Sequence, residues 1–212
     1  MSPTLTTHLL HHTPTSFHRA TTHPFLHAAG TGTLPRTTLA AWLSQDRLYA
    51  QSYVRFIGHL ISKIRLPYST TPTNPLEERI LTILTDSLTN IQRELTLFAT
   101  LSAQYALPLD TPPAGEDVFG PGVFTHAYTD MFVSAGSPGV SLLEGLVVLW
   151  ATEYCYLRSW QYARGVMERE RESGSGGSGP GDADGGALRE AFIPNWTSGE
   201  FAVIIGTYLV PM

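Results

Sequence analysis

The sequence contains one cysteine, Cys155, among its 212 residues. A single thiol cannot form an intramolecular disulfide, and it excludes metal sites that are built from several cysteines. A reducing compartment is the simplest setting for such a chain, so we expect a cytoplasmic protein. Long apolar runs are also missing, since Thr, His and Pro interrupt the amino-terminal residues and nothing approaches the roughly 18 apolar residues of a membrane span. We therefore expect neither a signal peptide nor a membrane partner.

Charge is the second scarce property, because Asp, Glu, Lys and Arg make up only 15% of the chain. The formal net charge is -5, and the 13 Lys and Arg residues form no cluster. Nucleic-acid-binding proteins need basic patches that neutralise phosphates, so we expect no nucleic-acid partner. Glycines are frequent between residues 173 and 186, but no lysine accompanies them there, as a phosphate-binding loop would require.

Histidines gather where acids are absent, because most of the eight lie in the amino-terminal part and no Asp or Glu precedes Asp46. The pairs His8/His12 and His23/His27 have the i, i+4 spacing that can bind zinc on a helix. No His-Glu-x-x-His motif accompanies them, so the favoured interpretation is that they hold no metal. The apolar faces of the long segments carry no histidine suited to a haem, and we expect no cofactor.

Apolar side chains return at steps of three and four residues along most of the chain, which is the spacing of one helix face. This pattern predicts three long helices, over residues 37–66, 75–106 and 140–171. It predicts shorter helices over residues 3–11, 14–30, 123–136, 187–194 and 197–209. The sequence therefore predicts an all-α fold, with one domain over residues 1–212. We expect a bundle of long antiparallel helices that includes a flexible Gly/Ser-rich loop at residues 173–186.

Asp46 lies within the apolar stripe of its predicted helix, four residues after Trp42 and three before Tyr49. Burying a carboxylate costs several kcal/mol unless charges or hydrogen bonds offset the cost. Two structural explanations stay open: an ion pair with Arg47 or Arg65, or a stripe shifted by one residue that leaves Asp46 at its edge. A ligand site is the functional explanation.

Glu153 repeats the anomaly on another long helix, because it follows Leu149 by four residues and precedes Tyr156 by three. Helical bundles build ligand sites from inward side chains on facing helices, so two such acids favour a shared site. Aromatic residues occur near both acids: Tyr49, Tyr53, Tyr156 and Trp160 on the same stripes, and Phe124 and Tyr128 on the short helix. Aromatic rings on helix faces are most often core, but rings beside carboxylates also suit a flat heteroaromatic ligand.

Cys155 does not share a helix face with Glu153. Two residues along an α-helix correspond to about 200° of rotation, so the two side chains point in roughly opposite directions. We interpret Cys155 as a buried, inert core residue rather than as a nucleophile.

Several groups of residues stand in a characteristic order. They are His23-Pro24-Phe25, Gly30-Thr31-Gly32-Thr33-Leu34, Trp42-Leu43-Ser44-Gln45-Asp46-Arg47-Leu48-Tyr49, Ala127-Tyr128 with Asp130, Leu149-Trp150-Ala151-Thr152-Glu153-Tyr154-Cys155-Tyr156 with Trp160, and Asn195-Trp196-Thr197-Ser198-Gly199-Glu200-Phe201. This set, over about residues 20–205, resembles the TenA/Thi-4 (thiaminase II-like) family. That family has the haem-oxygenase-like helical fold and acts in the salvage of the thiamin pyrimidine. The Gln-Asp helix and the Asn-Trp-Thr-Ser turn are the most specific parts of the resemblance.

The resemblance implies a function for the two acids. One branch of the family carries a catalytic Cys on the helix predicted at 140–171, and Glu153 resembles the branch that has Glu instead. Asp46 would hold the amidine edge of a 4-amino-2-methylpyrimidine, and Glu153 would move a proton to the leaving amine. Further substrate contacts would come from Tyr49, Tyr128, Phe25, Tyr156 and Trp196. The expected activity is hydrolysis of an aminopyrimidine, or of its formylated amine, in thiamin salvage.

The chain departs from the family near its end, because members usually continue with another helix that carries a further pocket Glu. A catalytically inactive pyrimidine-binding or interaction protein on the same scaffold is therefore the alternative. A third interpretation is haem or quinone-cofactor chemistry on this fold, which requires a buried proximal histidine. The resemblance also implies a homo-oligomer, either a dimer or a tetramer.

Overall fold

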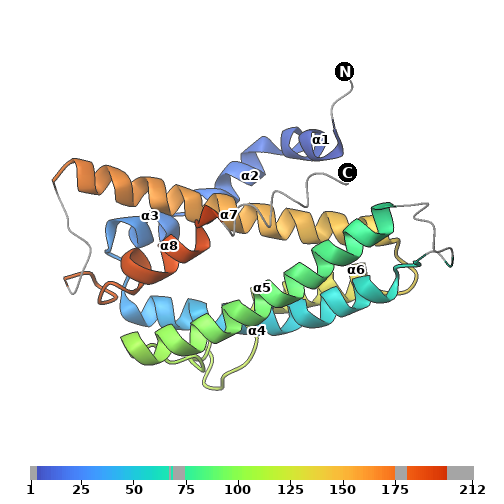
Figure 1. The fold of residues 1–212 in the computed structure, drawn as a ribbon. Helices are drawn as coiled ribbons and strands as arrows, with labels where there is room; N and C mark the ends of the chain where they lie inside the picture. Colours follow the sequence, from blue (N-terminus) through green and yellow to red (C-terminus); the bar gives the residue numbers. More distant parts are fainter. Residues whose placement is uncertain (1–3, 67, 69–74, 175–180, 200–212) are drawn as a thin grey trace. The chain divides into compact units, whose positions relative to one another are not determined.

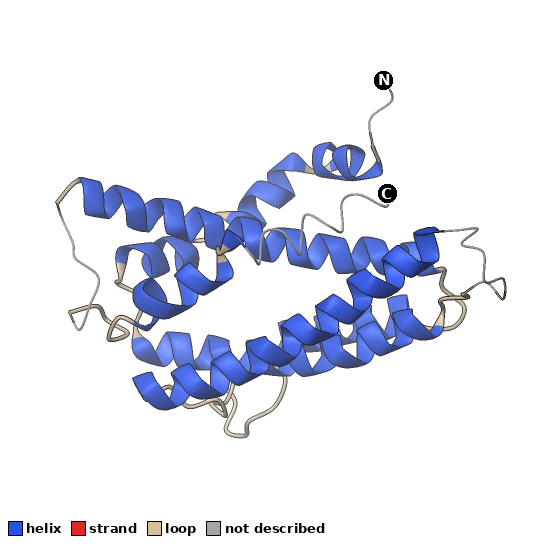
Figure 2. Ribbon diagram, in the orientation of Figure 1, coloured by secondary structure: helices blue, strands red, loops and turns tan. Residues whose placement is uncertain are grey.

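The computed structural model describes residues 4–66, 68, 75–174 and 181–199, and every regular element within them is a helix (Figure 2). In chain order these elements are α1 (Leu5–His12), α2 (Pro14–Thr21), α3 (Pro24–Thr31), α4 (Arg36–Ser62), α5 (Pro75–Tyr105), α6 (Val123–Gly136), α7 (Leu142–Glu172), the π-helix η1 (Ala187–Phe192) and α8 (Ile193–Trp196). The predicted all-α architecture is confirmed. None of these helices has the length and apolar character that crossing a bilayer requires.

The chain divides into two compact units, and the division falls inside two continuous helices. Among the described residues, the first unit holds residues 4–39, 150–174 and 181–199, and the second holds residues 40–66, 68 and 75–149. The first unit therefore contains α1, α2, α3, η1, α8 and most of α7. The second contains α5, α6 and most of α4.

In the second unit, α5 runs antiparallel to α4 (Figure 1). The residues that follow α5 return to the first half of α4, where the buried hydroxyl of Ser44 donates to the carbonyl of Pro108 at 3.2 Å. The same Ser44 oxygen accepts a hydrogen bond from the backbone N–H of Thr111 at 3.1 Å. The antiparallel pairing predicted for the long helices is thus confirmed for α4 and α5.

The short helix α6 runs in the same direction as α4 and pairs with it turn by turn. Near the start of α6, the ring of Tyr128 meets the ring of Tyr49 with centroids 5.4 Å apart. Further along both helices, Phe132 stacks on Phe56 at 4.6 Å with an interplanar angle of 7°. Both phenylalanines are buried, so this stack forms the core between the two helices.

In the first unit, α3 lies directly against α7 because Gly30 has no side chain. A Cβ atom added at Gly30 would lie 2.5 Å from the carbonyl oxygen of Ala163 and 2.7 Å from the Cβ of Val166. Such distances are shorter than van der Waals contact, so a larger residue would force the two helices apart. The buried glycine therefore sets the spacing between α3 and α7.

The segment before η1 docks on the turn that follows α3. The backbone of Ala183 donates to the carbonyl of Gly32 at 2.9 Å and accepts from the N–H of Arg36 at 3.3 Å. Gly32 ends α3 in the left-handed conformation with φ 72°. A Cβ added there would lie 2.7 Å from Oδ1 of Asp182 and 2.8 Å from Nε of Arg189, so both the conformation and the space require glycine.

A buried ion pair stabilises the docked segment that precedes η1. Nε of Arg189 donates to Oδ2 of Asp182 at 2.7 Å, and a second guanidinium nitrogen bonds Oδ1. The two side chains are only 4% and 5% exposed. The hydrogen bond to Asp182 raises the pKa of Arg189 above its ordinary value, so the guanidinium stays charged. Nearby, the carboxylate of Asp184 accepts from two backbone N–H groups at the start of η1.

The helix boundaries differ from the prediction in several places. The predicted 14–30 helix is interrupted between α2 and α3, because Pro24 opens a new helix and the ring of His23 caps it by accepting from the N–H of Phe25 at 3.2 Å. The α4 helix ends at Ser62 rather than at residue 66, and η1 is a π-helix. The predicted 197–209 helix and the middle of the 173–186 loop lie mostly outside the described residues.

A further difference is the start of α7, which begins at Leu142 rather than near residue 140. Ser141 and Glu144 form a capping box there: the Ser141 hydroxyl accepts from the N–H of Glu144 at 3.2 Å. In return, the Glu144 carboxylate accepts from the N–H and the hydroxyl of Ser141 at 2.9 and 2.6 Å. The Ser-x-x-Glu spacing is visible in the sequence and identifies this helix start.

The capping box predicts a pH-dependent contribution to stability. The side-chain and then the backbone hydrogen bond from Ser141 lower the pKa of Glu144. Stabilisation by this carboxylate is therefore present above the pKa of an unfolded Glu and is lost as the pH falls through the lowered folded pKa. Urea unfolding should show Glu144→Gln less stable than wild type at about pH 7, with the difference shrinking as the pH falls through the lowered pKa of Glu144. A difference that stays the same as the pH falls would contradict this role.

Candidate ligand-binding site

Asp46 interrupts the buried face of α4. The residues that follow each other on this face at steps of four and three are at most 2% exposed, namely Leu39, Leu43, Ala50, Tyr53, Ile57 and Leu60. Asp46 takes the position between Leu43 and Ala50 in this series, but it is half-buried. The α4 face is thus open to solvent at the level of the acid.

The centre of this face differs from the predicted stripe. The prediction stepped from Leu39 to Trp42 and later to Tyr49, both of which are half-buried. In the structure Leu43 and Ala50 are buried instead, each one residue further along the helix than the position that the prediction gives. The stripe is thus shifted by one residue at these two positions, but Asp46 stays within the buried series rather than at its edge.

Tyr49 and Tyr128 place two aromatic rings on the same face as Asp46. Tyr49 follows Asp46 by three residues, which puts both on one side of the helix. Its ring meets Tyr128 of α6 edge-on at 5.4 Å and 86°, and it also contacts the buried Phe132 at 5.3 Å. The second unit thus brings Tyr128 against Tyr49, which lies one helical turn after Asp46 on α4.

Glu153 interrupts the buried face of α7 in the same way. Four members of its series are at most 4% exposed, namely Leu149, Trp160, Ala163 and Met167. Glu153 and Tyr156 occupy the two intervening positions, and both are half-buried. The stripe predicted for this part of α7 is confirmed. It is partly exposed to solvent at Glu153 and Tyr156.

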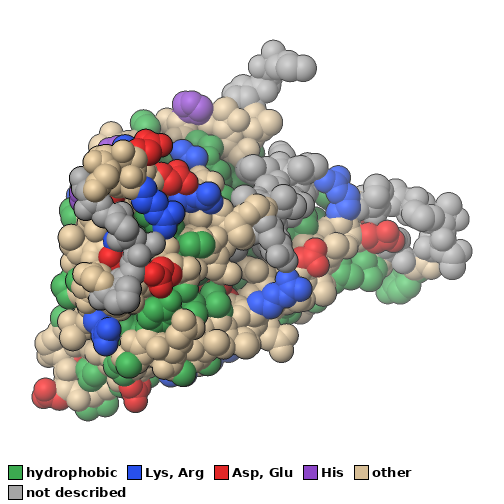
Figure 3. Space-filling view, turned by 60° about the vertical axis from the view of Figure 1, so that its left-hand side comes forward, with side chains coloured by type: hydrophobic (Ala, Val, Ile, Leu, Met, Phe, Trp, Pro, Cys, Tyr) green, Lys and Arg blue, Asp and Glu red, His purple; other side chains and the backbone are tan. Residues whose placement is uncertain are grey.

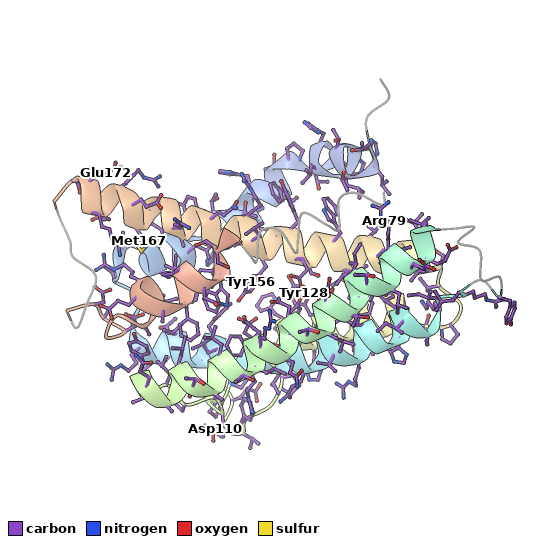
Figure 4. All side chains as sticks on the ribbon, in the orientation of Figure 1. Arg79, Asp110, Tyr128, Tyr156, Met167 and Glu172 are labelled. Carbon is purple, nitrogen blue, oxygen red and sulfur yellow. The ribbon has the colours of Figure 1, made fainter. Side chains whose placement is uncertain are left out.

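An aromatic cluster of the first unit surrounds Tyr156, which projects from α7 (Figure 4). Its ring lies edge-on to Trp196 of α8 at 5.8 Å and to Trp160 at 6.1 Å. The ring of Phe25 of α3 lies edge-on to that of Trp160, with centroids 6.5 Å apart. The ring centroids of Trp160 and Trp196 are 4.2 Å apart. Trp196 is fully buried, whereas Phe25 and Tyr156 are half-buried and present surface to solvent.

Arg164 holds the turn that carries Trp196, a role that the sequence pattern did not reveal. Its guanidinium donates to the carbonyl and the hydroxyl of Thr197 at 3.2 and 3.3 Å. The same hydroxyl donates to the carbonyl of Ile193 at 2.7 Å. These bonds fasten the Asn-Trp-Thr turn to α7 and fix the position of Trp196 in the cluster.

The predicted site residues divide between the two units. Asp46, Tyr49 and Tyr128 belong to the second unit, and Glu153, Phe25, Tyr156 and Trp196 belong to the first. Sequence reasoning missed Gln45, which lies next to Asp46 and binds three partners in the loop before α6 and in α6 itself. Its place in the Gln-Asp motif was the available signal.

Cys155 is half-buried, and burial raises the pKa of its thiol above the ordinary value. The thiolate is the nucleophilic form of cysteine, so a raised pKa keeps the side chain unreactive near neutral pH. This environment agrees with the interpretation of Cys155 as an inert residue, although it is less buried than predicted.

The histidines and acids of the described chain do not gather as metal ligands. Among those residues, no three His, Cys, Asp or Glu side chains are close enough to hold an ion together. The rings of His8 and His12 are 5.8 Å apart on α1, without a third candidate ligand. On the face shown in Figure 3, acidic and basic side chains are intermixed rather than separated by sign.

Comparisons with known proteins identify a family and a fold for this chain. The model of the TENA/THI-4/PQQC family matches residues 12–203. The X-ray structure of a TenA homologue from Pyrococcus furiosus has the same fold, with a TM-score of 0.71 and 20% identity, over 94% of this chain and 79% of that chain. The predicted haem-oxygenase-like helical fold class is thereby confirmed.

A curated relative from Fusarium pseudograminearum (strain CS3096), described as a "Probable transcription factor", is 33% identical over 227 residues. The match covers 96% of this chain but 43% of the relative, so the chain spans less than half the length of that protein. The match to the family model, which extends over most of the chain, shows that this protein belongs to the TENA/THI-4/PQQC family.

Proposed function

We propose that this protein is an aminopyrimidine or formylaminopyrimidine hydrolase of thiamin salvage, from the family branch that carries Glu in place of the catalytic Cys. Asp46 holds the aminopyrimidine edge, and Glu153 acts as acid and base. One observation carries the proposal: Asp46 is half-buried in an α4 face whose other members are at most 2% exposed, and on α7 Glu153 and Tyr156 are half-buried between the buried Leu149 and Trp160. A purely structural face would place an aliphatic residue at each position.

The environment of Asp46 suits recognition of an aminopyrimidine. A carboxylate accepts hydrogen bonds from the exocyclic amino group of such a ring. The rings of Tyr49 and Tyr128 offer an aromatic wall and two hydroxyl groups beside it. A flat ligand with one polar edge matches a site with one acid and several aromatic rings.

Glu153 supplies proton transfer in the proposed reaction. As a base, its carboxylate takes a proton from the attacking water while the water oxygen bonds to the carbon that carries the leaving amine. As an acid, it returns that proton to the amine nitrogen as the carbon–nitrogen bond breaks. A positioned general acid–base of this kind contributes roughly 100-fold to 10,000-fold to a rate.

The aromatic cluster of the first unit contributes the remaining proposed contacts. Phe25 and Tyr156 present half-buried rings on the unit that carries Glu153. Trp196 is fully buried, so its proposed contribution is to hold Tyr156 in place through their edge-on contact at 5.8 Å. The reaction needs no metal and no cofactor, because water is the nucleophile and a carboxylate moves the proton.

We also propose a cytoplasmic homo-oligomer, either a dimer or a tetramer. The α6 helix exposes large apolar side chains on one side, with Phe124 81% exposed and Met131, two turns later, 36% exposed. Exposed apolar side chains that gather on one helix are typical of surfaces that bind another protein. In this proposal, the exposed apolar side chains of α6 bind a second copy of the chain.

A second candidate function is ligand binding without catalysis. The relative from Fusarium is a longer protein whose description is not that of an enzyme, and this chain matches less than half of it. A catalytically inactive pyrimidine-binding or interaction protein would keep Asp46 and the tyrosines but would release no ammonia.

Thermal unfolding with a panel of aminopyrimidines, set beside haem, tests the proposal. A ligand present at 100 times its dissociation constant stabilises a protein by about 2.7 kcal/mol, which such a scan detects. We expect stabilisation by a 4-amino-2-methylpyrimidine and release of ammonia from an aminomethyl derivative or formate from its formylated form. Binding without turnover would favour the second candidate. Stabilisation by haem alone would contradict both.

A further inference from the structure

The start of α6 lacks a side-chain cap of its own. Its N-cap residue is Gly122, which has no side-chain oxygen to accept from the first-turn N–H groups. The N–H of Gly122 donates instead to Oε1 of Gln45 at 2.8 Å. The hydroxyl of Thr125, in the first turn, donates to the same oxygen at 2.7 Å. Gln45, on α4, thus takes the part that Glu or Gln takes in a capping box, because its oxygen accepts from the N–H of the N-cap residue.

The same side chain also fixes the loop before α6. Nε2 of Gln45 donates to the carbonyl of Gly120 at 3.0 Å, so its donor and acceptor atoms are both used. The preceding residue, Ser44, binds Pro108 and Thr111 at the other end of that loop. The two residues before Asp46 therefore hold both ends of the 108–122 segment against α4.

These bonds set the register between α4 and α6. On α4, Tyr49 follows Gln45 by four residues, and on α6, Tyr128 follows Thr125 by three, so each pair lies on one helix face one turn apart. The two helices run in the same direction, and Gln45 contacts Thr125. One turn further along both helices, Tyr49 and Tyr128 therefore lie opposite each other. Their rings do meet there, at 5.4 Å and 86°.

We propose that Gln45 is a positioning residue that caps α6 from α4 and thereby sets Tyr128 against Tyr49 beside Asp46. The consequence for the ligand rests on the proposed function, whereas the placement of the rings does not. Glutamine suits the position because the Gly120 carbonyl needs a donor while Gly122 and Thr125 need an acceptor.

Fluorine NMR of protein labelled with 3-fluorotyrosine tests the placement directly, and the Tyr128 signal is assigned by its loss in Tyr128→Phe. Gln45→Met keeps the side-chain length and removes all three bonds, so we expect a displaced or broadened Tyr128 signal. Gln51→Met is the matched control, because Gln51 is exposed on the same helix, and its spectrum should equal that of wild type. Thr125→Val removes a single bond and should displace the signal less, in the same direction.

A conservative variant separates positioning from general destabilisation. Gln45→Glu keeps the acceptor for Gly122 and Thr125, so we expect the Tyr128 signal to return close to its wild-type position. If Gln45→Met and Thr125→Val both fold with an unchanged Tyr128 signal, the proposal is overturned. If Gln45→Met does not fold, Thr125→Val decides in the same way.

Ligand titration connects the positioning role with the proposed function. We expect Gln45→Met to raise the dissociation constant of a 4-amino-2-methylpyrimidine at least tenfold, with a smaller change in turnover once substrate is saturating. Gln51→Met should change neither. If wild type binds no aminopyrimidine, the proposed function fails, while the fluorine spectra still decide whether Gln45 positions Tyr128.

Discussion

Replacing Arg189 with methionine is expected to lower the free energy of unfolding by about 3–5 kcal/mol. Arg189 and Asp182 are almost completely buried and bond through two pairs of atoms. Removal of the guanidinium leaves the nearly buried carboxylate of Asp182 without its cation. The cost comes from that unpaired charge, and urea unfolding at neutral pH measures it.

Two further variants identify the origin of this loss. Arg158→Met makes the same change at an exposed position of α7, where Arg158 donates to Oε1 of Gln161 at 3.1 Å, and should cost less than about 0.5 kcal/mol. The double variant Arg189→Met with Asp182→Leu removes both charges and should recover much of the stability. If Arg189→Met is no worse than Arg158→Met, the ion pair does not hold the docked segment.

Replacing Glu153 with glutamine is expected to lower turnover of the aminopyrimidine substrate at least about 100-fold while binding stays within about tenfold of wild type. The amide keeps the size of the side chain and can still hydrogen-bond a ring edge, but it cannot carry a proton between water and the leaving amine. Ammonia release under saturating substrate measures turnover, and calorimetric titration measures binding.

The matched control for this change is Glu172→Gln. Glu172 is the last residue of the same helix and is exposed. A substitution at an exposed helix end has little effect, so turnover should stay at the wild-type level. Unchanged turnover in Glu153→Gln would remove this residue from the mechanism.

The long helices follow from the sequence because their signals are local. Steps of three and four apolar residues, with prolines at the boundaries, gave α5 and α6 within one residue of their observed ends. The same signals marked Asp46 and Glu153 as anomalies, because a carboxylate in an apolar series is visible without any tertiary information. The family resemblance added the order of the motifs and the expected chemistry.

The remaining features depend on contacts between distant residues. The stripe of α4 was placed one residue off at Leu43 and Ala50, since Trp42 and Tyr49 are equally apolar choices and only packing decides between them. No local pattern shows that Gln45 caps a helix that begins 78 residues later, or that Arg164 bonds Thr197, 33 residues later. Non-local bonds of this kind are determined by the fold as a whole.

The proposed function assigns Asp46 and Glu153 to one aminopyrimidine ligand. Calorimetric titration of a 4-amino-2-methylpyrimidine into wild type, Asp46→Asn, Glu153→Gln and the double variant tests it most directly. Two residues that contact one small ring should show a coupling of more than about 0.5 kcal/mol in this cycle, with the largest single loss for Asp46→Asn. Wild-type affinity in Asp46→Asn, or strictly additive losses in the double variant, would contradict the claim.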